Sequence, residues 1–109
     1  EVVNADGVKN QIEGGIIQAT SCTLIEEVNF DGEIISATDW ENYPIIKFKQ
    51  TPQIHVELID RPEEPFLGVG EAAHGPTAAA ISNALFTAMN IRIKQLPITR
   101  ERIISSLNN

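Results

Sequence analysis

The sequence has few of the residues on which several kinds of site depend. It contains one cysteine, Cys22, and two histidines among 109 residues. One cysteine excludes a disulfide within the chain and a cysteine-based zinc site, and it suits a reducing compartment. We therefore expect a cytoplasmic location, with the periplasm as the alternative. His55 and His74 lie too far apart for metal-ligand spacing, so no side chain is assigned as a metal ligand.

Basic residues and long apolar runs are also scarce. Eight Lys and Arg stand against 15 Asp and Glu, which gives a formal net charge of −7. An acidic surface repels phosphate backbones, and no run of basic residues interrupts it, so we expect no nucleic-acid partner. No apolar stretch reaches the roughly 20 residues of a membrane-spanning helix, so we expect no membrane span in this segment.

Methionine occurs once, as Met89, and the chain begins at Glu1. Because the apolar pair Val2-Val3 follows at once, as at the end of a strand, we expect a piece cut from a longer protein. The length of 109 residues fits one compact domain around one hydrophobic core. Residues 1–109 are therefore treated as a single domain.

Helical patterns lie towards both ends of the chain. Apolar residues recur at spacings of three and four over residues 7–27, with Asp6 as the expected N-cap. A second helix is predicted over residues 77–89, because Pro76 suits a first turn. Thr99 is the expected N-cap of a last helix.

Two adjacent glycines, Gly14 and Gly15, lie in the middle of the first predicted helix. Each glycine disfavours a helix by about 1 kcal/mol relative to alanine. A helix retains such a pair where a neighbouring element must approach its backbone closely. We therefore expect another segment to cross the helix at this pair.

Between the helices the pattern favours strands. Asp31-Gly32 is a preferred two-residue turn between short apolar runs, which predicts a β-hairpin over residues 28–35. Residues 45–48 predict a short strand, and residues 54–59 alternate apolar with polar side chains, as in a strand with one buried face. The predicted fold class is α+β, with helices packed on a small mixed sheet.

Glu71 is an isolated carboxylate in a stretch rich in glycine and alanine. Residues 65–91 contain no other charged side chain, apart from neutral His74. Such a carboxylate is either a general base or a structural partner of the positive end of the following helix, and the residues alone leave both roles open. The spacing Gly68-x-Gly70-x-x-Ala73 formally fits a dinucleotide-binding fingerprint. We reject that function because prolines precede it and no second βαβ unit follows.

Two motifs resemble those of a known enzyme family, in the family's order and at about its separation. Residues 4–18 resemble the family's Gln-x-Glu-Gly-Gly helix. Gly68-Val69-Gly70-Glu71, together with residues 76–84 and the tail 92–103, resembles its C-terminal signature. The family is that of the molybdopterin-binding subunits of xanthine dehydrogenase and aldehyde oxidase. The resemblance implies that the chain is part of the C-terminal molybdenum-binding domain of such a subunit.

Further residues are similar to one branch of this family. Gln18-Ala19-Thr20-Ser21 and residues 40–44 are similar to the isoquinoline 1-oxidoreductase and nicotinate dehydrogenase β-subunits. Ala72-Ala73 replaces the Pro-Pro that follows the glutamate in many relatives, which fits this branch and argues against a purine substrate. Arg100 replaces a proline that is common in the family's tail, and we expect only a structural effect.

The resemblance implies a hydroxylase that oxidises an aldehyde or an N-heteroaromatic compound with oxygen derived from water. Glu71 stands at the position of the family's catalytic base. Gln11, Val69 and Gly70 stand at cofactor-binding positions, with Gln11 at the pterin and Gly70 beside the metal. The implied cofactor is molybdopterin with molybdenum, in its cytosine dinucleotide form, bound by the full-length subunit.

The implied partners are the remainder of the molybdopterin-binding subunit, an iron–sulfur subunit and a small-molecule substrate. We expect the chain alone to be inactive, because most of the family's cofactor ligands lie upstream, and self-association through surface meant for the rest of the subunit is expected. The alternative function is a free-standing acidic binding or interaction module without catalysis.

The remaining candidate residues favour structural roles. Cys22 is expected to be a small core residue, and His55 to be structural. Trp40 and Tyr43 are expected to pack under their loop rather than to stack on a substrate. His74 is expected to be a solvated loop histidine or, if functional, to line the substrate funnel.

Overall fold

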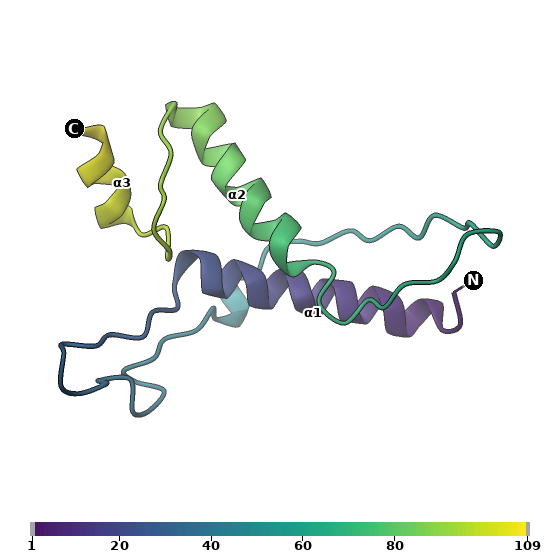
Figure 1. Cartoon of the computed structure of the whole chain (residues 1–109), viewed down its shortest axis with the longest axis horizontal. Coiled ribbons are helices and arrows are strands. Elements are labelled where there is room, and N and C mark those ends of the chain that lie inside the picture. Colours follow the sequence, from purple (N-terminus) through teal and green to yellow (C-terminus); the bar gives the residue numbers. More distant parts are fainter. Residues whose placement is uncertain (1, 109) are drawn as a thin grey trace.

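The computed structural model describes residues 2–108, and within this range it contains three α-helices joined by long extended connections (Figure 1). The helices are α1 (Ala5–Leu24), α2 (His74–Met89) and α3 (Arg100–Leu107). A single 3-10 turn, η1 (Phe48–Gln50), interrupts the connection between α1 and α2. None of the described helices is long and apolar enough to cross a bilayer. The N-terminal end of α2 meets the middle of α1 (Figure 1).

Local capping residues determine where the helices begin and end. The N-cap of α1 is Asn4, whose Oδ1 accepts a hydrogen bond from the Gly7 amide at 2.8 Å. The prediction of Asp6 as the N-cap is wrong. Asp6 lies in the first turn of α1, where the helix dipole also favours a carboxylate. Pro76 lies in the first turn of α2 as predicted, although this helix begins at residue 74 rather than 77. Asn90 ends α2 in the left-handed conformation with a φ of 56°.

Gly15 is the point at which α1 and α2 come closest. It is buried, and a Cβ placed on it would lie 3.2 Å from the Ala73 Cβ and 3.9 Å from Nδ1 of His74. The predicted close approach at the glycine pair is therefore confirmed for Gly15. Gly14 has nothing within 4 Å of the corresponding position and is exposed, so the crossing requires only one of the two glycines.

The predicted mixed sheet is wrong, because no sheet exists within residues 2–108. Where a hairpin was predicted over residues 28–35, the structure has one isolated antiparallel bridge, between Phe30 and Ile35. The predicted strand over residues 45–48 instead runs into η1. An isolated two-stranded hairpin is marginal in water without further strands or a helix against one face, and Phe30 and Ile35 are both exposed.

Residues 54–59 are extended but form no ladder. Ile54, Val56 and Leu58 are partly buried while their neighbours are exposed, which matches the predicted alternation of faces. No described residue forms a hydrogen bond with the backbone of this segment. The face pattern follows from the sequence, whereas a ladder also requires a second strand, which the described part of the chain does not supply.

The expected single hydrophobic core is also absent from the described residues. The only buried hydrophobic residues among them are Ala19, Ala73 and Ile98. Ile98 lies at the C-terminal half of α1, where its amide donates to the Thr23 carbonyl at 2.6 Å. The Cα radius of gyration is 17.1 Å, against about 13 Å for a compact domain of this length. The chain is an open arrangement of helices and extended arms.

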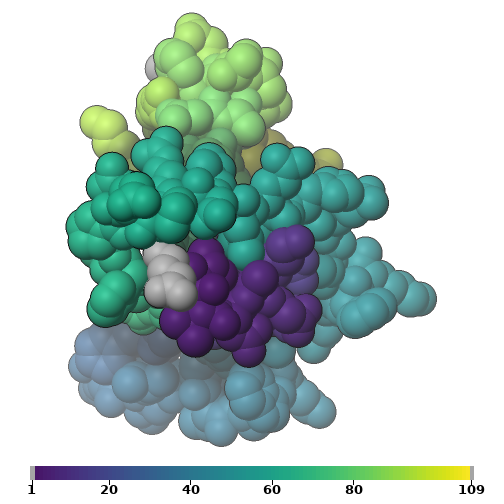
Figure 2. Space-filling view, turned by 90° about the vertical axis from the view of Figure 1, so that its right-hand side faces the viewer, coloured from purple at the N-terminus to yellow at the C-terminus, as the bar shows by residue number. Residues whose placement is uncertain are grey.

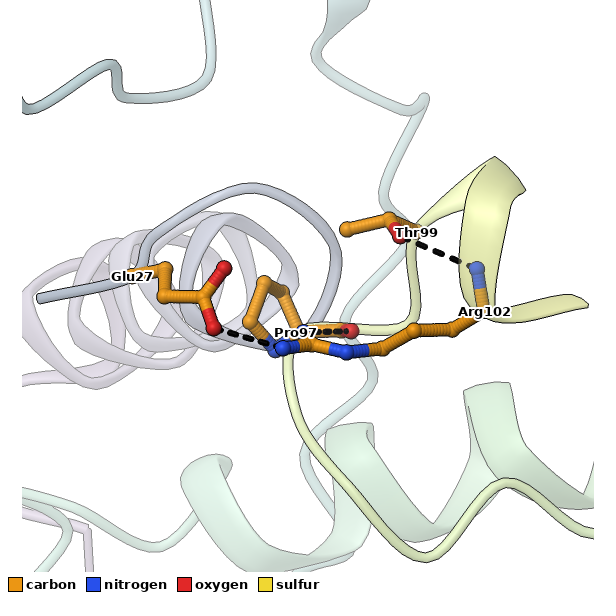
Figure 3. A network of polar contacts seen from close by, with 4 residues as sticks. All are labelled: Glu27, Pro97, Thr99 and Arg102. Atoms are coloured by element: carbon orange, nitrogen blue, oxygen red, sulfur yellow. Dashed lines mark hydrogen bonds and ion pairs between the residues drawn. The ribbon is translucent and has the colours of Figure 1, made fainter. Parts of the chain in front are cut away.

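Arg102 joins the C-terminal tail to the end of α1 (Figure 3). Its guanidinium donates to the Pro97 carbonyl at 2.7 Å and forms an ion pair with Glu27 at 2.5 Å. Thr99 caps α3 as predicted, since its Oγ1 accepts from the Arg102 amide at 3.3 Å. One arginine therefore fixes α3 relative to α1, although the two helices are far apart in the sequence.

Candidate active site

The two motifs singled out in the sequence meet where α1 passes the loop before α2. The side-chain Nε2 of Gln11 donates to the carbonyl oxygen of Gly70 at 2.8 Å, across 59 positions in the sequence. Four residues further along α1, Gly15 contacts Ala73. Positions four apart lie on the same face of a helix. One face of α1 therefore contacts the loop that contains Glu71 both before and after this glutamate.

Glu71 lies exposed in the turn that leads into α2. Its carbonyl accepts a hydrogen bond from the His74 amide at 3.1 Å. The N-cap of α2 is Ala73, which provides no side-chain cap. Within residues 2–108, no group forms a hydrogen bond or an ion pair with the Glu71 carboxylate. The Glu71 side chain therefore makes no capping hydrogen bond to α2, although it lies three residues before the positive end of this helix, and both roles that the sequence left open stay open.

A cavity of about 720 Å³ lies between the first turns of α1 and the segment before α2. Gln11, Val69 and Gly70 all line it, and Glu71 follows directly after this lining. Figure 2 shows this face, with the start of α1 in purple beside the segment before α2 in teal and green. The exposed side chains of Phe66 and Leu67 also line the cavity, so most of its wall is apolar.

No family model matches the chain. Over 97% of its length it is 45% identical to one of the subunits of nicotinate dehydrogenase from Pseudomonas putida, of which it covers 9%. It is 34% identical, over 89% of its length, to the β-subunit of isoquinoline 1-oxidoreductase from Brevundimonas diminuta, of which it covers 12%. It is 26% identical, over 97% of its length, to the molybdenum-binding subunit of aldehyde oxidoreductase from Escherichia coli, of which it covers 15%.

The crystal structure of quinoline 2-oxidoreductase from Pseudomonas putida matches 99% of this chain with a TM-score of 0.81 and 32% identity. The chain belongs to the xanthine dehydrogenase/aldehyde oxidoreductase family of molybdenum-binding subunits. The family and the branch indicated by the motifs are thereby confirmed. The chain spans between 9% and 15% of the length of these relatives, so it corresponds to a limited segment of each.

The structure brings the predicted site residues of the two motifs together. Gln11 comes from the Gln-x-Glu-Gly-Gly motif, and Val69, Gly70 and Glu71 come from the Gly-x-Gly-Glu motif. The hydrogen bond between the Gln11 side chain and the Gly70 carbonyl was not predicted from the sequence. Both residues were assigned to a cofactor, and no signal in the residues indicates that they also contact each other.

His74 is not a solvated loop histidine. It is the first residue of α2 and is partly buried against Gly15, because this helix begins earlier than the periodicity predicted. Its Nδ1 is buried and has no hydrogen-bond partner among the described residues. A buried nitrogen without a partner is uncommon, and the position beside Glu71 makes His74 part of the site's surroundings.

Cys22 and Trp40 differ from their predicted positions. Cys22 is exposed, because the buried face of α1 contains its neighbours Ser21 and Thr23 instead. Trp40 is 73% exposed and does not pack under its loop. His55 is exposed, as expected for the polar face of its segment.

Tyr43 forms a polar pair with Glu26 at the end of α1, away from the cavity. Its hydroxyl donates to Oε2 of Glu26 at 2.7 Å. Burial raises the pKa of Glu26, but hydrogen bonds from Ser21, Tyr43 and Cys22 outweigh it, and the pKa lies below its ordinary value. The hydrogen bond to Glu26 raises the pKa of Tyr43. The two shifts agree with a phenol that donates to a carboxylate.

Proposed function

We propose that this chain supplies the catalytic base and part of the cofactor-binding surface of a molybdenum hydroxylase. The enzyme oxidises an aldehyde or an N-heteroaromatic compound other than a purine, with oxygen derived from water. The proposal rests chiefly on the hydrogen bond from Gln11 to Gly70, because it joins the two family motifs beside a cavity and directly before Glu71. The relatives are named as oxidoreductase subunits, which supports the class of reaction.

The residues around the cavity suit a bulky molybdopterin cofactor, which we propose in its cytosine dinucleotide form. Gly68 and Gly70 have nothing within 4 Å of the position that a Cβ would occupy, so another group can approach the backbone. The Oε1 of Gln11 accepts no hydrogen bond from the described residues, and an amide suits the donor and acceptor edge of a pterin. Val69, Gly70 and Gln11 would hold this edge.

The described residues include no group of three or more His, Cys, Asp or Glu side chains that could hold a metal ion. We propose that the ligands to molybdenum come from the pterin and from other parts of the subunit. The chain then contributes proton transfer rather than metal coordination.

Glu71 acts as the general base in this proposal. Its carboxylate is exposed and has no partner among the described residues, so it is available to accept a proton from the water-derived oxygen. When bound, the cofactor would polarise that oxygen and take up the two electrons released as a C–H bond becomes a C–O bond. The proton that leaves the oxygen passes to Glu71, and solvent removes it between turnovers.

The proposed partners are the remainder of the subunit, an iron–sulfur subunit and the small-molecule substrate, in the cytoplasm. Exposed apolar side chains support the first of these, among them Phe66 at 85%, Leu67 at 87% and Trp40 at 73%. The unpaired extended segment 54–59 also supports it, because backbone groups that become buried require hydrogen-bond partners. Residues 1–109 act as one unit of the subunit, inactive alone.

The substitution Glu71→Gln in the complete enzyme tests the proposal, since glutamine keeps the shape of the side chain and cannot accept the proton. We expect kcat to fall by about 100- to 10,000-fold, with unchanged molybdenum and pterin content. Glu63→Gln, in the exposed loop upstream, is the matched control and should keep its turnover. Unchanged turnover of Glu71→Gln would remove Glu71 from the role of base.

A further inference from the structure

The peptide before Glu71 is held from outside its own loop by one side chain. Within residues 65–73, the only hydrogen bond with an element other than the following helix is the one from Gln11 to the Gly70 carbonyl. Gly68 and Gly70 both lie in this loop just before Glu71, and glycine gives a loop access to many backbone conformations. The conformation of this loop therefore depends strongly on a single contact.

Peptide geometry transmits this contact to Glu71. The carbonyl oxygen of Gly70 and the Cα of Glu71 belong to one planar peptide unit, so fixing the oxygen restricts the Cα. On the other side, the carbonyl of Glu71 accepts from the His74 amide at 3.1 Å. The peptide before Glu71 is thus fixed from α1, and the peptide after it is fixed by the start of α2.

The position of Gln11 is itself determined by the helix crossing. Gly15 lies four residues further along α1 and contacts Ala73, three residues after Gly70. Because α1 is continuous from Ala5 to Leu24, the distance between these two contacts is fixed by helical geometry. The amide of Gln11 therefore reaches the loop from a rigid support.

From these contacts we infer that Gln11 is a positioning residue for Glu71, in addition to any contact with a cofactor. It holds the Gly70 carbonyl, and thereby sets the place from which the Glu71 carboxylate accepts a proton. This inference rests on the proposed function. Catalytic groups must be held closely, since a misplacement of about 1 Å can lower a rate about 100-fold.

The substitution Gln11→Met in the complete enzyme removes the donor and keeps the length of the side chain. We expect kcat to fall by about 10- to 100-fold and KM to change by less than about 3-fold. Molybdenum content, pterin content and the visible spectrum should stay unchanged. Hydrogen–deuterium exchange of the peptide that spans residues 66–73 should become faster. Gln18→Met, an exposed glutamine on the same helix, is the matched control and should alter none of these.

A second variant, Gln11→Glu, distinguishes positioning from a general loss of structure. An ionised glutamate has no amide donor and places a negative charge one peptide away from Glu71. A like charge raises the pKa of a carboxyl, so the acid limb of the kcat/KM profile should move to higher pH. A variant that has lost the local structure would no longer hold residue 11 beside this loop and would leave the acid limb in place.

Unchanged kcat and unchanged exchange in Gln11→Met would overturn the inference. A loss of molybdenum and pterin in proportion to activity would also overturn it, because Gln11 would then act only as a cofactor ligand. The proposed function has a separate test, since its failure is seen as full turnover of Glu71→Gln. A Glu71-dependent enzyme that tolerates Gln11→Met would contradict the positioning role alone.

Discussion

At the scale of single residues, the geometry around Glu71 depends on side chains that are small. Gly15 allows the start of α2 to approach α1, and Ala73 occupies the space beside it. Ala73 is buried with only 8% of its surface exposed. A larger side chain at either residue would separate the two helices. It would thereby move Gly70 away from the amide of Gln11.

The pair Gly14→Val and Gly15→Val tests this dependence with equal changes in helix propensity. At position 14 nothing lies within 4 Å of the new Cβ, whereas at position 15 the new Cβ meets the Ala73 Cβ at 3.2 Å. Forcing extra atoms into a close contact costs about 1–3 kcal/mol. We expect a lower thermal unfolding midpoint and lower turnover for Gly15→Val than for Gly14→Val in the complete enzyme. Equal midpoints would show that the helix crossing does not require Gly15.

At the scale of elements, the extended segment 54–59 has the side-chain pattern of a strand without a neighbour. Ile54, Val56 and Leu58 share a partly buried face, and the backbone of the segment has no partner in the described part of the chain. In the proposed complete subunit, we expect a strand from the remainder of the subunit to pair with segment 54–59. This pairing would supply the sheet that the sequence predicted.

Amide exchange tests the pairing directly. In the complete enzyme, at least alternate amides of residues 54–59 should exchange slowly, because the N–H groups of a paired strand alternate in direction. In the isolated 109-residue chain the same amides should exchange at the rate of unprotected backbone. Rapid exchange in both samples would contradict strand pairing.

The elements that depend on local chemistry were predictable from the sequence. Thr99 caps α3, Pro76 lies in the first turn of α2, and the close approach at Gly15 follows from its place in a helix. The first two features depend on residues a few positions apart, and a glycine pair within a helix indicates a close approach without identifying its partner, Ala73. The cap at Asn4 was missed because Asp6, two residues later, is an equally good capping type.

Features that depend on distant partners were not predictable in the same way. The prediction of a sheet was wrong because an alternating pattern indicates which side chains share a face of a segment, but does not indicate whether a second strand pairs with it. The contact between Gln11 and Gly70 spans 59 positions, and neither residue type indicates it. Glu71 could be singled out only as an unusual carboxylate. Its assignment as a base came from the resemblance of the motifs and stays a proposal.

At the scale of the whole molecule, the chain is too open to enclose a large cofactor. Its radius of gyration of 17.1 Å and its few buried apolar residues leave large side chains exposed. Among the described residues, only the start of α1 with the residues before it and the segment 59–70 line the cavity beside Gln11 and Gly70. The remaining walls are expected from the rest of the subunit, of which the relatives contain a much greater length.

The molybdenum and pterin content of the purified 109-residue chain, measured beside that of the complete subunit, tests the central claim most directly. The claim is that this chain contributes Glu71 to a site that other parts of the subunit complete. It predicts a chain without metal or pterin beside a subunit loaded with both. Stoichiometric molybdenum and pterin on the short chain alone would contradict it, because the chain would then be a cofactor-binding unit by itself.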